Sequence, residues 1–396
     1  MTLATATSRL VSSLDPRRAH EVCEQLLSSA GVTVGGSAPW DMRVHDERLW
    51  PRILRDGTLG VGEAYVDGWW DAPAPDQFFE RVLRARLGDA MRETWMLVPH
   101  VVRARVLNLQ SLRRATGNGR HHYDLGNDLY EAMLDRRMLY TCALWNGDGT
   151  GDDDLEAAQE RKLAHVCTKL GLRPGMRVLD LGCGWGGFAA YAAEHHGVHV
   201  TGFTVSEEQV RWAHQHHGHL AVDVRLGDYR QAAGTFDAVV SIGLMEHVGP
   251  KNYRAYMELV DRCLAARGVA LIHTIGGNRA RTQLEPWFDR YIFPGGVLPT
   301  LSQLVTAMEG LFIPEDIDNI GADYDPTLMA WWRRFDAAWP RLQARYDPRF
   351  YRIWSYYLLA SAGAFRARGQ QLFQIVMTRP GTPPPPGRRG LPRSPA

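Results

Sequence analysis

A glycine-rich segment near the middle of the chain has residue types that could hold a cofactor. It reads DLGCGWGG from Asp180 to Gly187 and directly follows an apolar run of strand length. Glycines let the backbone turn sharply out of a strand and approach a bound molecule closely. Such a loop at the carboxyl edge of a parallel sheet is a typical site for a nucleotide-like ligand.

Two cofactor classes fit the spacing of these glycines. Gly182, Gly184 and Gly187 match the dinucleotide pattern G-x-G-x-x-G, whereas Asp180, Gly182, Gly184 and Gly186 match the acidic-x-G-x-G-x-G loop of S-adenosylmethionine-dependent methyltransferases. A dinucleotide fold places an acidic residue about 20 residues further on, at the end of the next strand. Here that strand ends without one, so the loop favours S-adenosylmethionine over a nicotinamide cofactor.

Three acid–base residues lie at or near further predicted strands. His273 is inside the strand over residues 269–276, Glu246 follows the strand over residues 236–243, and Asp228 follows a short third strand. A histidine beside a carboxylate can move a proton or hold a small anion. Each residue also has a bland alternative: a satisfied core histidine, a carboxylate in the first turn of a helix, and a solvated turn aspartate.

The elements that must position these residues follow an α/β pattern. Apolar runs of strand length alternate with helical stretches, and an alanine-rich helix ends at Gly197. This pattern is typical of a parallel sheet covered on both faces. We therefore predict an α/β protein with a Rossmann-like S-adenosylmethionine-dependent methyltransferase domain and a smaller, largely helical N-terminal domain.

The predicted domain boundaries follow from breaks in this periodicity. Residues 90–112 are still helical in pattern, so the first cut falls in the polar stretch over residues 113–120. The domains are then an N-terminal domain with its linker, an α/β domain and a disordered tail rich in Pro, Gly and Arg. They span residues 1–116, 117–378 and 379–396. The resemblance and the arginines described below imply lipid or membrane docking for the first domain and catalysis for the second.

Composition excludes several classes of protein. The chain has 396 residues, of which 45% are hydrophobic and 22% charged, as in folded globular proteins. Its net charge of +1 gives no reason to expect nucleic acid as a partner. Five cysteines without a C-x-x-C pair indicate a reducing, cytoplasmic compartment and no metal site. No stretch approaches the roughly 18 apolar residues of a membrane span.

Seven segments resemble the cyclopropane-fatty-acyl-phospholipid synthases and the related mycolic acid cyclopropane synthases. Two more, AGVTVGGSAPWDMRV and LGVGEAYVDGWWD, resemble the N-terminal domain of the longer, phospholipid-acting members. The resemblance covers nearly all of the chain except its two ends. The seven segments are residues 121–145, 178–187, 241–253, 271–276, 286–296, 321–332 and 362–368.

The resemblance implies transfer of a methylene unit from S-adenosylmethionine to a cis double bond in an acyl chain of a membrane phospholipid. It also implies which residues contact the cofactor, including hydroxyl and amide groups in place of the missing strand-two acid. These residues are Tyr140, Thr141, Asp180, Gly182, Gly184, Gly186, Thr204, Ser206, Gln209, Asp228 and Tyr229.

By the same resemblance, a bound bicarbonate ion takes the proton that is lost as the ring closes. Its cradle would consist of the backbone N–H groups of Cys142 and Ile275 and the side chains of Glu246, His273 and Tyr324. Amides, an imidazole and a phenol suit a small anion. The acidic Glu246 fits only if it shares a proton or orients His273.

One residue departs from the family pattern and leaves alternatives open. Ser361 stands where a cysteine commonly precedes the segment AGAFRAR, and a serine cannot act as a thiolate. One alternative product is a methyl- or methylene-branched chain made from the same alkene. Another alternative is an inactive homologue that only binds the cofactor or lipid.

Nine arginines between residues 81 and 120 are interleaved with apolar residues. Such a segment could dock on the inner face of the cell membrane, although a solvated arginine-rich face gives the same pattern. The expected partners are the phospholipid bilayer with its unsaturated acyl chains and, from the resemblance, a second copy of the chain in a homodimer. Aromatic residues in the last third of the chain fit either core packing or an acyl channel.

Overall fold

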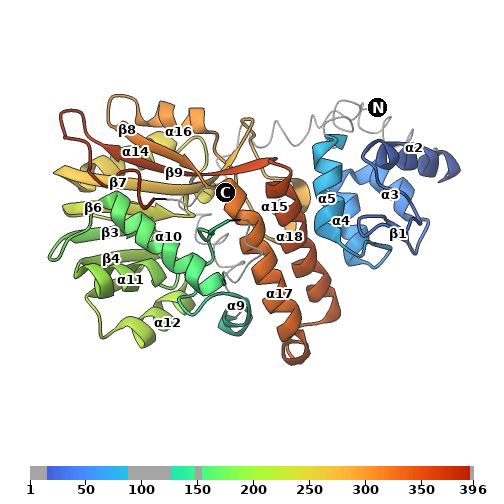
Figure 1. The fold of residues 1–396 in the computed structure, drawn as a ribbon, viewed down its shortest axis with the longest axis horizontal. Coiled ribbons are helices and arrows are strands. Elements are labelled where there is room, and N and C mark those ends of the chain that lie inside the picture. The colour runs from blue at the N-terminus through green and yellow to red at the C-terminus, as the bar shows by residue number, and fades with distance from the viewer. Residues whose placement is uncertain (1–15, 88–125, 148–153, 393–396) are drawn as a thin grey trace, which may run out of the picture. The chain divides into compact units, whose positions relative to one another are not determined.

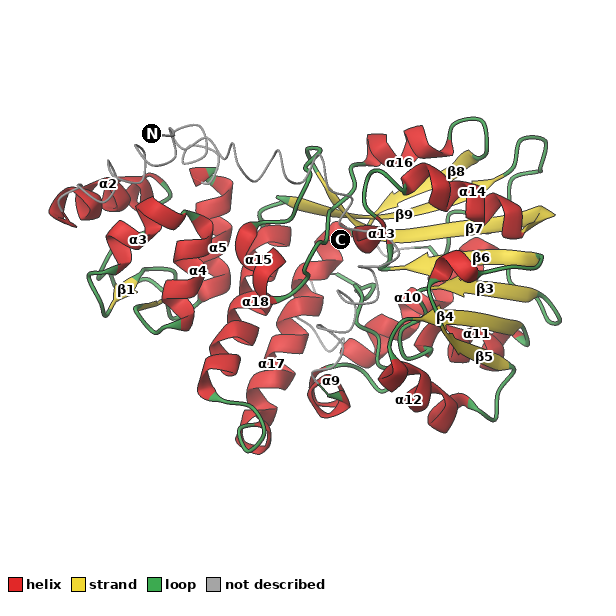
Figure 2. Cartoon of the chain, turned by 180° about the vertical axis from the view of Figure 1, so that it is seen from behind, coloured by secondary structure: helices red, strands yellow, loops and turns green. Residues whose placement is uncertain are grey.

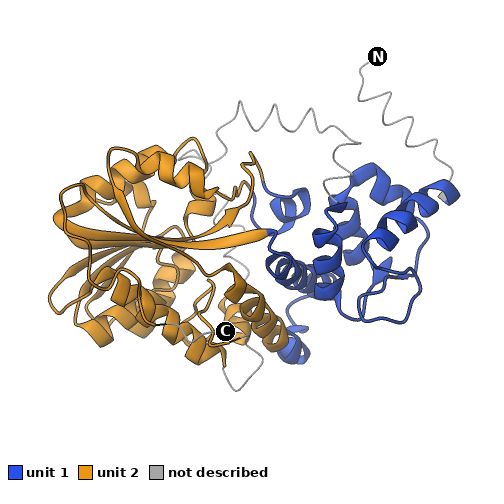
Figure 3. Ribbon diagram, turned by 45° about the horizontal axis from the view of Figure 1, so that its top comes forward, with its two compact units in different colours: residues 1–103, 284–294, 336–369 blue, residues 104–283, 295–335, 370–396 orange. Residues whose placement is uncertain are grey.

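The computed structural model describes residues 16–87, 126–147 and 154–392 (Figure 1). These residues form two compact units, which Figure 3 shows in different colours. The first unit contains the N-terminal helices together with Leu284–Pro294 and Asp336–Gly369, and the second contains the remaining described residues. The chain therefore enters the first unit three times.

The second unit is built on a seven-stranded sheet with the order β5-β4-β3-β6-β7-β9-β8 (Figure 2). The first five strands in this order pair in parallel, whereas β9 runs antiparallel to β7 and β8. This sheet confirms the predicted Rossmann-like α/β class. The strands are β3 (Arg177–Leu181), β4 (His199–Thr204), β5 (Val222–Leu226), β6 (Phe236–Ile242), β7 (Leu264–Gly277), β8 (Ile313–Asn319) and β9 (Gln370–Thr378).

Helices cover both faces of this sheet, because neighbouring strand residues point to opposite sides and both sets are apolar. Leu179 packs with Met257 of α14 on one face, and Val178 packs with Leu163 of α10 on the other. The helices are α9 (Asn127–Met133), α10 (Leu155–Leu170), α11 (Gly187–His196), α12 (Glu207–His217), α13 (Met245–Val248), α14 (Tyr253–Cys263) and α16 (Leu301–Met308), with the 3-10 turns η1 (Tyr229–Gln231) and η2 (Gly321–Asp323).

The first unit is largely helical, as predicted for the N-terminal region. The division between the units falls inside α17 (Tyr324–Leu342). The other elements of the first unit are α2 (Pro16–Ser29), α3 (Leu49–Asp56), α4 (Thr58–Val66), α5 (Pro75–Arg84), α15 (Pro286–Tyr291) and α18 (Pro348–Arg366), with the two-stranded pair β1 (Arg43–Val44) and β2 (Trp70–Asp71).

Helix α18 packs closely on α5 within the first unit. A Cβ atom at Gly363 would lie 2.5 Å from the carbonyl oxygen of Asp76, and Arg366 Nη1 lies 2.7 Å from Asp76 Oδ2. The segment AGAFRAR thus supplies both the small residue and the cation of this contact. The predicted boundary after residue 116 placed the residues of α15 and α18 in the catalytic domain, whereas these helices pack with the N-terminal helices.

Most aromatic residues of α17 and α18 are core residues, whereas Trp332 and Trp339 are half-buried. Trp331 and Phe335 are fully buried in the second unit. Trp354 and Tyr356 are buried in the first, where the Tyr356 ring lies 4.3 Å from that of Trp287. These positions agree with the core interpretation of the aromatic stripe.

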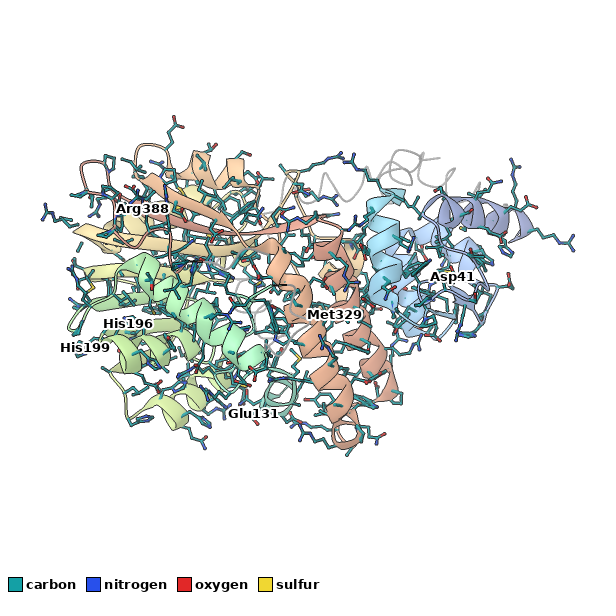
Figure 4. The ribbon with its side chains drawn as sticks, in the orientation of Figure 1. Asp41, Glu131, His196, His199, Met329 and Arg388 are labelled. Atoms are coloured by element: carbon teal, nitrogen blue, oxygen red, sulfur yellow. The ribbon has the colours of Figure 1, made fainter. Side chains whose placement is uncertain are left out.

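The prediction of a disordered tail is wrong for residues 379–392, the segment that contains Arg388 in Figure 4. Arg379 Nε donates to Asp261 Oδ1 at 2.6 Å, and the Leu391 N–H donates to His165 Nδ1 at 3.0 Å. A segment too rich in Pro and Gly to form a core of its own is held here by hydrogen bonds to the core of its neighbours.

Two sequence-based expectations about the whole chain can be compared with the described residues. All five cysteines lie in the described ranges as buried thiols outside any disulfide, as expected from the sequence. None of the helices in the described ranges is long and apolar enough to cross a membrane. Most of the arginine-rich stretch, residues 88–120, lies outside the described residues.

Candidate active site

The glycine loop joins β3 to α11 at the carboxyl edge of the sheet. Gly182, Gly184 and Gly186 have φ angles of 83°, 55° and 81°, a conformation that other residues rarely adopt. The N–H groups of Gly182 and Cys183 both donate to the carbonyl oxygen of Phe203, at 3.1 and 2.9 Å. A Cβ atom at Gly184 would meet no atom within 4 Å, so the loop backbone is open at this point.

Asp180 is buried at the end of β3, just before this loop. It points to the same face of the sheet as Val178, the face that α10 covers. Burial raises the pKa of Asp180 to about 7, and the positive charge of Lys162 opposes this rise. Lys162 therefore favours the ionised form of the Asp180 carboxyl group, against the effect of burial.

The residues at the end of β4 form a hydrogen-bonded turn. Thr204 Oγ1 contacts Gln209 Oε1, and the Ser206 N–H donates to Thr204 Oγ1 at 3.3 Å. Ser206 Oγ in turn accepts the Gln209 N–H as the N-cap of α12. These three buried side chains fix the turn, and their predicted contact with the cofactor stays a prediction.

Asp228 and Tyr229 follow β5 at the same edge of the sheet. Asp228 Oδ1 accepts the Arg230 N–H at 2.9 Å and lies 3.0 Å from Arg230 Nε. Asp228 is 7% exposed, so the alternative of a solvated turn aspartate is wrong. Burial raises the pKa of Tyr229 to about 12, which keeps its phenol protonated at neutral pH.

The segment with Thr141 and Cys142 is held by two side chains of α10. Lys162 Nζ donates to Thr141 Oγ1 at 3.0 Å, and Gln159 Nε2 donates to the Thr141 carbonyl oxygen at 2.9 Å. Gln159 and Lys162 are one helical turn apart and fully buried. Elsewhere in the second unit, Trp212 Nε1 of α12 donates to Glu131 Oε1 of α9 at 3.1 Å; Glu131 is labelled in Figure 4.

The fold brings Tyr324 close to the segment with Tyr140 and Thr141, two residues predicted to contact the cofactor. The rings of Tyr140 and Tyr324 lie 5.2 and 6.0 Å from that of Trp331. Cys142 Sγ lies 4.0 Å from the carbonyl oxygen of Ile320, four residues before Tyr324. Thus Tyr324, although far away in the sequence, lies near the segment that contains Tyr140 and Cys142.

Glu246 lies in the first turn of α13, as its bland alternative predicted, and it also contacts β7. The Ile275 N–H donates to Glu246 Oε1 at 2.6 Å, so this N–H is not available to an anion in the way the resemblance implied. Burial raises the pKa of Glu246 to about 7. Glu246 Oε2 is buried and has no hydrogen-bond partner among the described residues.

His273 lies on β7 beside Gln374 of β9. Gln374 Nε2 is 3.2 Å from His273 Nδ1, so we assign Nδ1 as the acceptor and Nε2 as the nitrogen that carries the proton. Burial holds the pKa of His273 well below its usual value, and the ring is neutral. Within the described part of the chain, His273 Nε2 has no hydrogen-bond partner. A histidine fully satisfied within the core would have partners for both ring nitrogens, whereas His273 has one only at Nδ1 among the described residues.

Neither of the two units contains both Ser361 and the other predicted site residues. Ser361 lies on α18 in the first unit, whereas the other predicted site residues all belong to the second. Ser361 is 9% exposed. Its role stays a prediction.

Sequence reasoning missed three buried polar residues: Gln159, Lys162 and Gln374. The two on α10 orient Thr141, and Gln374 sets the tautomer of His273. Only Lys162 left a signal in the sequence, because it is one of just three lysines among 45 Lys and Arg residues.

Comparisons with known proteins agree with this architecture. Residues 110–375 match the family model described as mycolic acid cyclopropane synthetase. The cyclopropane-fatty-acyl-phospholipid synthase of Escherichia coli (strain K12) is 48% identical over 360 residues, which are 91% of this chain and 93% of that protein. The tuberculostearic acid methyltransferase UfaA1 of Mycobacterium tuberculosis is 31% identical, over 96% of this chain and 93% of that protein.

A solved structure has the same fold. It is the mycolic acid cyclopropane synthase CmaA1 complexed with SAH and CTAB, which is 30% identical with a TM-score of 0.62 and covers 66% of this chain and 97% of that chain. The match of the family model over most of the chain, the 48% identity and the shared fold all point to one family. This chain belongs to the cyclopropane synthase family.

Proposed function

We propose that this chain transfers a methylene unit from S-adenosylmethionine to the cis double bond of an unsaturated phospholipid acyl chain, forming a cyclopropane ring. One observation carries the proposal: the open glycine loop lies at the same edge of the sheet as two buried polar atoms, Glu246 Oε2 and His273 Nε2, that lack partners among the described residues. A buried polar atom without a partner costs about 1–3 kcal/mol, so both atoms would be stabilised by a ligand that offers hydrogen bonds at this edge. The similarity to the E. coli synthase supports the same activity.

The glycine loop and Thr141 suit S-adenosylmethionine, which supplies an electrophilic methyl group when bound. Gly182 and Gly184 would let it approach the backbone, and the carboxylate of Asp180 would balance its positive charge. SAH in the structure of CmaA1 supports this class of cofactor.

An alkene is a weak nucleophile, and methyl transfer to one of its carbons leaves a cation on the other. The residues around this point must keep water out and must not trap the cation. Tyr140 and Tyr324, which pack against the buried ring of Trp331, are aromatic residues that can do both, because ring faces stabilise a nearby cation without bonding to it. The Cys142 thiol is directed to the carbonyl oxygen of Ala143, at 3.2 Å.

Ring closure releases a proton, and bicarbonate would supply the base for it. The donor set fits a small anion: His273 Nε2 carries a proton and lacks a partner among the described residues, and Glu246 with a pKa of about 7 can donate from Oε2 when protonated. Tyr324 adds a phenol. Ile275 and Gln374 then hold Glu246 and His273 in place.

We further propose that the enzyme works at the inner face of the cell membrane as a homodimer in the cytoplasm. Its substrate lies in a bilayer, and the arginine-rich stretch over residues 81–120 has the charge needed to dock on anionic lipid. In the described part of this stretch, Arg81 lies 3.6 Å above the ring of Trp40, and Arg84 pairs with Glu80 at 2.8 Å.

A branched product is the second candidate. Ser361 and the 31% identity to a tuberculostearic acid methyltransferase favour it, whereas the 48% identity to a cyclopropane-forming synthase favours the ring. Both products require the same cofactor and the same alkene.

The test is incubation of the purified chain with S-adenosylmethionine and vesicles of an unsaturated phosphatidylethanolamine. We expect the acyl chains to gain one CH₂ group and to give the upfield proton resonances of a cyclopropane. Gain of the same mass with vinyl or methyl-branch resonances would replace the ring by the second candidate. Bound cofactor with unchanged lipid would show an inactive homologue.

A further inference from the structure

Lys162 is a fully buried cation in the middle of α10. It belongs to the face of the helix that packs on the sheet, beside Leu163 and Val166. A buried cation is costly unless other groups in its surroundings compensate it. Its partners therefore indicate what the charge does.

The choice of lysine at this position is informative because the chain uses arginine at nearly all of its cationic sites. Of its three lysines, Lys162 and Lys169 are both fully buried on α10, and Lys251 is exposed. An ammonium group is compact and acts as a point charge, whereas the planar guanidinium fork needs more room. The pocket around Lys162 therefore fits a compact charge.

The direct contact of Lys162 is with the segment that carries the predicted cofactor residues. Its Nζ donates to Thr141 Oγ1 at 3.0 Å, while Gln159 fixes the carbonyl oxygen of Thr141. The side chain and the main chain of Thr141 are thus both held from one helix. Cys142, the next residue, is fully buried.

The charge of Lys162 also acts on both halves of the site. Asp180 of the glycine loop and His273 of β7 point to the sheet face that α10 covers. Burial raises the pKa of Asp180 to about 7, and the charge of Lys162 opposes this rise. Burial lowers the pKa of His273, and the charge of Lys162 adds to this effect together with those of Lys169 and His165. Asp135 and Asp180 in turn stabilise the ammonium group against burial, which lowers the pKa of Lys162 to about 8.

We propose that Lys162 is a positioning residue of the active site, whose ammonium group fixes Thr141 and places a positive charge beside Asp180 and His273. The inference rests on the proposed function, because that function gives Thr141 and Asp180 their roles toward the cofactor. Lys162 acts through these residues and needs no contact with the acyl chain.

The pH dependence of cofactor binding follows from the groups around Lys162. These are Asp135 and Cys142 from the segment before α10, and Asp180 from β3; the charge of Asp180 also acts on Cys183 and Tyr256. Without the ammonium group, Asp180 takes up its proton at a higher pH. Binding of a positively charged cofactor then begins to weaken at a higher pH on the acid side.

The experiment measures SAH binding to the full chain by titration calorimetry across neutral pH, for the wild type, Lys162→Met and Thr141→Val. We expect Lys162→Met to weaken binding by about ten-fold or more, the effect of losing a charged hydrogen-bond donor. Titrated with S-adenosylmethionine, whose sulfonium carries the positive charge that SAH lacks, Lys162→Met should also lose acid-side binding at a higher pH than the wild type. Thr141→Val should weaken binding as well, and the double variant should bind no more weakly than Lys162→Met alone, because both changes remove the same contact.

The matched control is Lys169→Met. Lys169 is equally buried two turns further along α10, but it pairs with Asp316 and Asp318 of β8 at 3.1 and 3.4 Å. We expect its SAH affinity to stay within about two-fold of the wild type at a comparable loss of thermal stability. Equal weakening by both lysine variants would reduce Lys162 to a structural residue.

Wild-type affinity and pH profile in Lys162→Met would overturn the inference. If Lys162→Met does not fold, Thr141→Val decides alone, and unchanged affinity in that variant contradicts the role of the contact. A wild-type chain that binds SAH but leaves lipid unchanged contradicts the proposed function, whereas the binding measurements still decide the role of Lys162.

Discussion

Burial shifts the pKa values of Glu246 and His273 in opposite directions, because in each case it favours the uncharged form. Below about pH 7, protonated Glu246 and the neutral imidazole of His273 then provide hydrogen-bond donors toward an anion without adding charge to the site. The two side chains are held by Ile275 and Gln374, which lie on neighbouring strands. This arrangement resolves the question of why an acidic residue would line an anion site.

At the residue scale, we expect Glu246→Gln to retain activity and Glu246→Leu to lose about a hundred-fold in kcat/KM. Glutamine can accept the Ile275 N–H and donate from its amide, as protonated Glu246 does. In the wild type, kcat/KM should fall as the pH rises above about 7, because the donor is lost as Glu246 ionises. The pH–rate profiles of the three proteins test this.

In Glu246→Gln this alkaline fall should disappear, because the amide does not titrate. The pKa of Glu246 is raised in the folded chain, so its contribution to stability is complete below pH 4.5 and is lost as the pH approaches 7. Thermal melting should therefore depend less on pH in this window for Glu246→Gln than for the wild type. An identical alkaline limb in both proteins would show that another group titrates.

At the scale of elements, the loop between β3 and α11 can be separated into a structural and a binding contribution. Gly184 and Gly171 have nearly the same backbone conformation, with φ of 55° and 62°, and a Cβ atom at either position would meet nothing within 4 Å. Gly184 lies in the glycine loop, whereas Gly171 caps α10. The two glycines therefore form a matched pair.

Replacing either glycine by alanine should cost about 1–2 kcal/mol of stability, because alanine is strained in this conformation. Only Gly184→Ala should also weaken SAH binding, by about ten-fold, since its new methyl group would point into the open space at the loop. Calorimetric titration with SAH and thermal melting separate the two effects. Equal SAH affinity in the two variants would place the cofactor away from Gly184.

The elements around this loop were largely predictable from the sequence. Four apolar runs and the alanine-rich helix became β3, β4, β6, β7 and α11, because each is a local pattern that a covered parallel sheet requires. The contacts of α10 were not predictable. A polar residue on a helix can face solvent or a buried partner, and nothing in the local pattern of Gln159 and Lys162 reveals Thr141.

At the scale of the whole molecule, the order of the chain does not determine which helices pack together. Helix α18 packs with α5 in the first unit across more than 280 residues of sequence, through Gly363, Arg366 and Asp76. The tail follows the same principle, since Arg379 and Leu391 bind residues far back in the chain. Long-range contacts of this kind leave no periodicity in the sequence.

We expect Gly363→Leu to destabilise the first unit selectively, because its side chain would meet the backbone of α5 at Asp76 and Glu80. Amide hydrogen exchange should rise in α5, α15 and α18 and stay low in β3, β6 and β7. The control is Gly369→Ala, whose Cβ atom would lie 3.4 Å from its nearest neighbour. A uniform rise in exchange across both units would contradict this division of the chain.

The most direct test of the central claim is the fate of the transferred methyl group. The wild-type chain is incubated with S-adenosylmethionine deuterated in its methyl group and with vesicles of an unsaturated phospholipid, and the acyl chains are then examined by mass spectrometry and NMR. Ring formation predicts that two of the three deuterons are retained, in a cyclopropane methylene. Retention of all three deuterons in a methyl branch, or of two in a vinylic methylene, would contradict it.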